Sequence, residues 1–278
     1  MGAKFDVKVL TRNKVFLAGL IILFTVAVVA VFADAIAPHP YDEMNVSLAL
    51  RAPQPQFPFG TDQYGRCVFS RVIYGTRIAL GVGLVVVLVE SLIGVTLGLL
   101  AGYYGKKFDK IVMFVTDLTW ALPPLVMALA IVTMLGPSLI NVVIAIAAVS
   151  WAQFARIVRA KTQALKNMPF VEAARAFGEG DLNIILRYIL PNVLSPIIVL
   201  STLSLPQAIL STTSLGFLGL GAQPPSPDWG LILSEGKNYI RQAPWISIFP
   251  GIALVYTVLG FNLLGEGLRE ILDPRLKL

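Results

Sequence analysis

Long apolar runs, separated by short basic segments, constrain the fold of this chain more than any other feature. The first run, residues 15–33, has no charged side chain and would span about 28 Å as an α-helix. Hydrophobic residues make up 56% of the 278 residues and charged residues only 14%, which is more apolar than a soluble domain of this length. Because a helix satisfies its own backbone hydrogen bonds in lipid, these runs predict an all-α, polytopic membrane protein.

The apolar runs predict six transmembrane helices in one transmembrane domain, residues 1–278. The predicted spans are residues 15–37, 78–101, 111–135, 139–155, 193–213 and 246–265. The first run exceeds the roughly 7 to 15 apolar residues of a cleaved signal peptide, so an uncleaved span is favoured. The proline-rich segment 38–77 predicts extended chain and turns, and then a short helix over 68–74.

Two residue pairs predict local features of the spans. Pro123 and Pro124 predict a kink in the third span, because proline lacks the N–H that continues a helix. Gly94 and Gly98 lie four positions apart in the second span, a spacing that favours close helix packing in lipid.

The positive charges predict the orientation of the chain. With the N-terminus in the cytoplasm, sixteen of the 22 lysine and arginine residues fall on the cytoplasmic side. Both termini and the loop 156–192 are then predicted to be cytoplasmic. The basic residues form short clusters without interleaved aromatic residues, so orientation in a membrane explains the net charge of +6 better than nucleic-acid binding does.

The sequence contains no pattern that predicts catalysis, a cofactor site or a metal site. The nearest match to a phosphate-binding loop, at 105–107, has Leu100 in place of the upstream glycine and lacks the Ser or Thr after lysine. One cysteine, Cys67, and one histidine, His39, exclude an intrachain disulfide and argue against a metal cage or a catalytic triad. If ATP drives this protein, another chain must bind and hydrolyse it.

Two acidic residues, Glu90 and Asp117, lie within predicted spans. An ionisable group is costly there and is therefore a functional candidate. For Asp117 the favoured interpretation is a structural hydrogen bond near the cytoplasmic third of its span. For Glu90 two interpretations are equally open: it lines a pore, or it pairs with a partner subunit.

One polar, helix-prone segment lies between the apolar runs, at residues 171–178. Pro169 can begin a short helix, alanines favour its interior, and Gly178 can supply the left-handed residue that ends it. So short a helix is marginal alone in water, so a partner surface must hold it if it is ordered. The small side chains of Ala173 and Ala174 would let that surface approach closely. We therefore predict a docking element.

The docking element resembles the cytoplasmic loop signature of permease subunits of bacterial binding-protein-dependent ABC importers. The signature residues here are Glu172, Ala173, Ala174, Gly178, Leu190 and Pro191. Further matches lie at residues 60–66, 70–71, 215–221, 224–225, 229–230, 262–265 and 273–276. Together they are similar to the second permease of dipeptide, oligopeptide and nickel importers over nearly the whole chain, although Tyr188 and Cys67 stand where histidine and aspartate are common.

The resemblance implies the fold of a type I ABC importer permease, in the cytoplasmic (inner) membrane, and a transport subunit rather than an enzyme. The residues that it implies for coupling to an ATPase are Glu172, Ala173, Ala174, Arg175 and Gly178. Glu172 and Arg175, three positions apart, can also pair on one helical face. The implied partners are a homologous permease that completes a heterodimer, two cytoplasmic ABC ATPases that bind ATP and magnesium, and an extracytoplasmic substrate-binding protein.

The resemblance also implies a di- or oligopeptide substrate. Close relatives carry nickel chelates, opines or antimicrobial peptides, which are the alternatives, and an ATP-independent channel or membrane enzyme is a more distant one. The aromatic residues of the last outer loop, Phe217, Trp229 and Trp245, are candidates to contact the binding protein.

Overall fold

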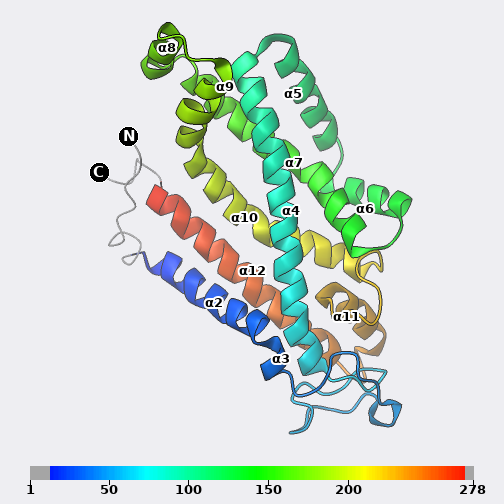
Figure 1. The fold of residues 1–278 in the computed structure, drawn as a ribbon. Coiled ribbons are helices and arrows are strands. Elements are labelled where there is room, and N and C mark those ends of the chain that lie inside the picture. The colour runs from blue at the N-terminus through cyan, green and yellow to red at the C-terminus, as the bar shows by residue number, and fades with distance from the viewer. Residues whose placement is uncertain (1–12, 273–278) are drawn as a thin grey trace.

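The computed structural model describes residues 13–272 and consists of helices joined by loops (Figure 1). Within that range it has no β-strand, only two isolated bridges between residues 54 and 67. The all-α prediction is thus confirmed. Outside the described residues lie the basic residues Lys4, Lys8, Arg12, Arg275 and Lys277 and the matched segment 273–276.

Five described helices are long and apolar enough to cross a membrane. They are α2 (Lys14–Val31), α4 (Val68–Tyr104), α7 (Leu139–Leu165), α10 (Leu190–Phe217) and α12 (Trp245–Leu272). The bent pair α5 (Lys106–Trp120) and α6 (Pro124–Leu135) makes a sixth crossing if it is counted as one span. The six predicted spans therefore correspond to five continuous helices and one broken helix.

The predicted span 111–135 is two helices rather than one kinked helix. α5 and α6 are bent by 89° relative to each other. Pro123 has an extended backbone, with ψ at 129°, and Pro124 is the first residue of α6. Because a proline cannot donate to the preceding turn and is favoured at a helix start, the consecutive prolines separate two helices.

The predicted short helix 68–74 and the predicted span 78–101 form one helix, α4, of 37 residues. The charged Arg77 lies in the gap between the two predicted helices, but this residue has partners on α2. Its guanidinium donates hydrogen bonds to the carbonyl oxygens of Ala30 at 2.5 Å and Val31 at 2.9 Å. These contacts satisfy carbonyls at the end of α2, which have no partner within that helix, and let α4 continue past the charge.

Three further spans are longer than predicted, whereas the first, predicted over 15–37, divides into α2 and the short helix α3 (Ala33–Ile36). α7 runs ten residues past the predicted end at 155, and α10 and α12 extend beyond 193–213 and 246–265 at both ends. An apolar run ends at the first charge, whereas a helix continues where its polar residues find water or a partner. Basic residues on the last part of α7 find such partners on α5, where Arg159 pairs with Asp109.

The helix α4 packs along α7 through its glycines, as predicted. A Cβ atom on Gly98 would lie 2.7 Å from the carbonyl oxygen of Ala155, and one on Gly94 would collide with Phe154. Only a residue without a side chain allows the two backbones to come so close. Figure 1 shows α4 and α7 at the centre of the bundle, with α10 and α12 beside them and α2 packed on α12.

The two ends of the bundle carry different short elements (Figure 1). One end holds α8 (Pro169–Ala176) and α9 (Asp181–Asn183), followed by the π-helical segment η2 (Ile184–Ile189). The opposite end holds the loop 37–67 and α11. The elements there are α3 (Ala33–Ile36), η1 (Val46–Leu48), α11 (Trp229–Gly236) and η3 (Lys237–Tyr239).

Candidate functional site

The predicted docking element is a short helix with the expected start and end. Pro169 is the first residue of α8, and Gly178 adopts the left-handed conformation, with φ at +84°. A residue with a side chain would be strained at that φ. The chain therefore leaves α8 through a turn that favours glycine.

One face of α8 is packed on the bundle. Val171 and Ala174 are buried in a cluster with residues of α4, α7, η2 and α10. The hydroxyl of Tyr103, at the end of α4, donates a 2.7 Å hydrogen bond to Asp181. Ala174 thus faces its own chain, and only Ala173 of the two predicted small residues is free for a partner.

The opposite face of α8 is exposed and consists of Glu172, Ala173, Ala176 and Phe177, together called the α8 face. Phe177 has 89% of its surface exposed, which is unusual for an aromatic residue unless a partner covers it. The ion pairs of the described residues do not include the expected pair of Glu172 and Arg175. Sequence reasoning missed Phe177, although an aromatic beside a helix-ending glycine in a polar loop was the available signal.

The α8 face is connected to a membrane helix through the turn at residues 177–180 and then a continuous helical segment. After α8 the chain enters α9, then η2, and then α10. In η2 the N–H of Leu190 bonds to the carbonyl of Ile185, five residues earlier. Such wide turns occur often at functional sites, and Pro191 cannot donate the next bond of a regular helix. Because Val171 and Ala174 also pack in one cluster with residues of η2 and α10, a force on α8 can reach α10 through this packing.

A polar cavity of about 410 Å³ lies among α4, α7 and α10. Its polar lining residues are Glu90, Ser150, Gln153, Ser204, Gln207 and Ser211. Gln153 and Gln207 are exposed, whereas Glu90 is only 2% exposed, so the polar lining leads from the surface to a buried carboxyl. Ser150 and Ser204 line the same cavity as that carboxyl.

Asp117 contacts α7 and does not line the cavity. It accepts a 2.7 Å hydrogen bond from Arg156, whose guanidinium also lies 4.4 Å from the ring centre of Trp120. This is the structural hydrogen bond that the sequence favoured for Asp117. The cavity thus contains only one of the two acidic residues singled out from the spans.

Two family models match this chain. The model described as "Binding-protein-dependent transport system inner membrane component" matches residues 94–278, and that of the "N-terminal TM domain of oligopeptide transport permease C" matches residues 7–53. The chain belongs to this permease family. The permease therefore has the fold of type I ABC importer permeases. It is a multi-pass protein of the inner membrane and a transport component of its system. Such a system includes ATPases and a substrate-binding protein.

Several curated relatives are similar to the permease over most of their length. The dipeptide transport system permease protein DppC of Alkalihalophilus pseudofirmus is 46% identical over 97% of this chain and 89% of the relative. The glutathione transport system permease protein GsiD of Pectobacterium atrosepticum is 43% identical over 94% of this chain and 86% of the relative. The di/tripeptide transport system permease protein DppC of Pseudomonas aeruginosa is 42% identical, over 96% and 90%.

The end of the permease opposite α8 is held together by a buried ion cluster. Arg66 and Arg71 both bond to Asp62, at 2.6 and 2.7 Å, and to Glu235 of α11, each at 2.8 Å. Both arginines are fully buried. The motif 60–66 therefore fixes α11 to the start of α4.

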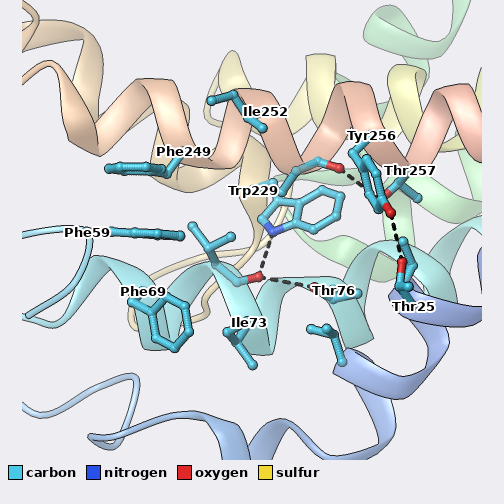
Figure 2. Close-up of a pocket in the computed structure, with 14 residues that line it drawn as sticks. Thr25, Phe59, Phe69, Ile73, Thr76, Trp229, Phe249, Ile252, Tyr256 and Thr257 are labelled. Atoms are coloured by element: carbon cyan, nitrogen blue, oxygen red, sulfur yellow. Dashed lines mark hydrogen bonds between the residues drawn. The ribbon is translucent and has the colours of Figure 1, made fainter. Parts of the chain in front are cut away.

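The aromatic residues of this end are mostly packed inside it (Figure 2). Trp229 is buried and its indole N–H donates a 3.0 Å hydrogen bond to the carbonyl of Val72, in the wall of an apolar pocket of about 230 Å³. The indole of Trp245 donates to Thr61. Of the three residues predicted to contact a binding protein, only Phe217 is exposed, so the prediction is wrong for Trp229.

Proposed function

We propose that the permease carries di- or oligopeptides across the cytoplasmic membrane as one half of a permease heterodimer. Two ATPases bind ATP and magnesium and dock on the cytoplasmic loops of the pair, so this chain itself binds no cofactor. A substrate-binding protein delivers the peptide at the opposite end, which carries α11. The names of the relatives support the choice of substrate class.

The exposed Phe177 on the α8 face carries the docking proposal. A large apolar side chain next to a helix end, surrounded by small and polar residues, fits a pocket on a partner surface. Closure of two ATPases would move α8, and the connected segment η2 would pass the movement to α10. Discrete alternative packings of such helices are the physical requirement of alternating access.

The basic residues support cytoplasmic termini in the proposed orientation. Among the described residues, Lys14 begins α2, Arg269 lies near the end of α12, and six basic residues lie in the loop 156–192. The positive-inside rule places these segments in the cytoplasm, on the side of the ATPases. Arg66 and Arg71 lie at the other end, where both are paired with Asp62.

Reconstitution tests the proposed function. The permease, its homologous partner and both ATPases are placed in proteoliposomes with ATP inside, and the binding protein with labelled alanylalanine is added outside. We expect uptake that requires both ATP and the binding protein. Uptake without the ATPases would contradict the proposal and favour a channel.

The same preparation tests the docking role of Phe177. Truncation of a central aromatic residue of an interface costs about 2 kcal/mol, so Phe177→Ala should weaken ATPase binding by roughly thirtyfold. Phe24→Ala is the matched control, because Phe24 is also strongly exposed, at 68%, but lies within the span α2. Equal ATPase binding by both variants and the unmodified permease would contradict docking through the α8 face.

Glutathione is the second candidate substrate, because a 43% identical relative is named a glutathione permease. Competition decides between the two. Excess glutathione should leave alanylalanine uptake unchanged if the system carries ordinary peptides. Complete inhibition, together with direct uptake of labelled glutathione, would favour the second candidate.

A further inference from the structure

We infer that the polar cavity is a binding site for the peptide during its passage, and that Glu90 holds the peptide's α-ammonium group. The inference rests on the proposed peptide transport and adds to it a site and a recognised group. It starts from the carboxyl of Glu90, which is buried at the end of a cavity in the middle of the apolar part of α4.

The carboxyl of Glu90 lacks a cationic partner among the described residues. The ion pairs of residues 13–272 do not include it, and none of the residues that line the cavity is basic. Ser150 and Ser204 can donate hydrogen bonds to it but leave its charge uncompensated. An acidic group within a membrane usually marks a substrate or ion pathway, because a protein without such a need would avoid it.

The other polar groups of the cavity fit a peptide backbone. Gln153 and Gln207 each have donors and an acceptor, which matches the N–H and C=O groups of any peptide irrespective of its side chains. The volume of about 410 Å³ lies within the range of small-molecule sites. The cavity has room beside the carboxyl for a cationic group that its lining residues do not supply.

An α-ammonium group complements the carboxyl because it has three N–H donors and a full positive charge. Charge-assisted hydrogen bonds of this kind are about twice as strong as neutral ones. The amide groups at the opening would then bind the backbone of the same peptide, while Glu90 binds its N-terminal end. A peptide without the α-amino group should lose only the contact with Glu90.

A double-mutant cycle tests this contact in the reconstituted importer. Initial uptake is measured for the unmodified permease and Glu90→Gln, with alanylalanine and with its analogue that has a hydroxyl in place of the α-amino group. We expect Glu90→Gln to lower alanylalanine uptake about tenfold and to change analogue uptake by less than about twofold. Any preference of the binding protein for one compound cancels in these ratios.

Ser91→Ala is the matched control within the same helix. Ser91 follows Glu90 directly, but its hydroxyl bonds to the carbonyl of Leu88 and it does not line the cavity. Its replacement should leave uptake of both compounds unchanged. Assembly with the partner permease and ATP hydrolysis stimulated by the loaded binding protein should be normal in both variants.

Thiol labelling at the cavity tests the contact between Glu90 and the peptide even if the binding protein does not deliver the analogue. Cys67 is 2% exposed, so a cysteine introduced by Gln207→Cys at the cavity becomes the reactive thiol of the described chain. Alanylalanine should slow its labelling during ATP turnover, and Glu90→Gln should remove this protection.

Four outcomes would overturn the inference. Equal loss of uptake for both compounds, or failure of Glu90→Gln to assemble with the partner permease, would assign Glu90 to a structural pair. Normal uptake and normal thiol protection in Glu90→Gln would show that the carboxyl does not hold the peptide. Absence of peptide uptake by the unmodified importer would instead contradict the proposed function, and the inference with it.

Discussion

At the scale of single residues, the ion cluster around Arg66 and Arg71 gives a clear expectation for stability. Glu235→Gln keeps the side-chain shape but leaves two buried arginines facing one acidic residue, Asp62. Removal of one partner of a buried ion pair costs roughly 3 to 5 kcal/mol. We therefore expect a lower thermal unfolding midpoint for purified Glu235→Gln.

The control for this prediction is Glu266→Gln. Glu266 and Arg269 are both exposed, with 4.0 Å between their charged groups, and such surface pairs contribute at most about 1 kcal/mol. If the two variants unfold at the same temperature, the buried cluster is not a stabilising link between α4 and α11.

The same cluster illustrates the limit of what single residues reveal in the sequence. Pro169 and Gly178 were predictable because their effects are local: a fixed φ at a helix start and a positive φ after a helix end. The pairing of Arg71 with Glu235 was not, because the two residues are 164 positions apart and are joined only by the fold. For the same reason the burial of Cys67 emerged only from the structure.

At the scale of helices, the packing of α4 on α7 depends on the absence of a side chain at Gly98. Gly98→Val would place carbon atoms where the backbone of Ala155 lies, and overpacking of this kind typically costs about 1 to 3 kcal/mol. We expect a lower yield of folded permease and a lower unfolding midpoint in detergent.

Gly81→Val is the matched substitution on the same helix. A Cβ at Gly81 would meet no atom of the described residues within 4 Å, so this variant should behave like the unmodified permease. Equal destabilisation by the two substitutions would mean that β-branching in α4, and not contact with α7, causes the loss.

Helix identity was more predictable than helix length or continuity. Apolar runs predicted every membrane helix, because burial in lipid depends on composition. They misplaced the start of α4, because Arg77 finds carbonyl partners on α2. They also merged α5 with α6, because the apolar composition of a segment is the same whether its helix is straight or broken. The start and end of the docking element were predictable from the sequence. Which of Ala173 and Ala174 faces outward was not.

At the scale of the whole molecule, the proposed orientation places α8 in the cytoplasm and the loop 37–67 outside. Because Cys67 is buried, it cannot serve as the accessible thiol that its outer position suggested. Because it is buried, Cys67 should not react with a thiol reagent when cysteines are introduced elsewhere. Val46, in the outer loop, and Phe177, beside α8, are both strongly exposed, at 72% and 89%.

We expect a membrane-impermeant thiol reagent to label Val46→Cys in intact cells and Phe177→Cys only after the membrane is opened. The unmodified permease should remain unlabelled under both conditions, which controls for Cys67. The two introduced thiols lie at opposite ends of the bundle, so no single orientation can expose both to one side (Figure 1). Labelling of Phe177→Cys in intact cells would reverse the orientation, and with it the assignment of the α8 face to the ATPases, because ATP is available only in the cytoplasm.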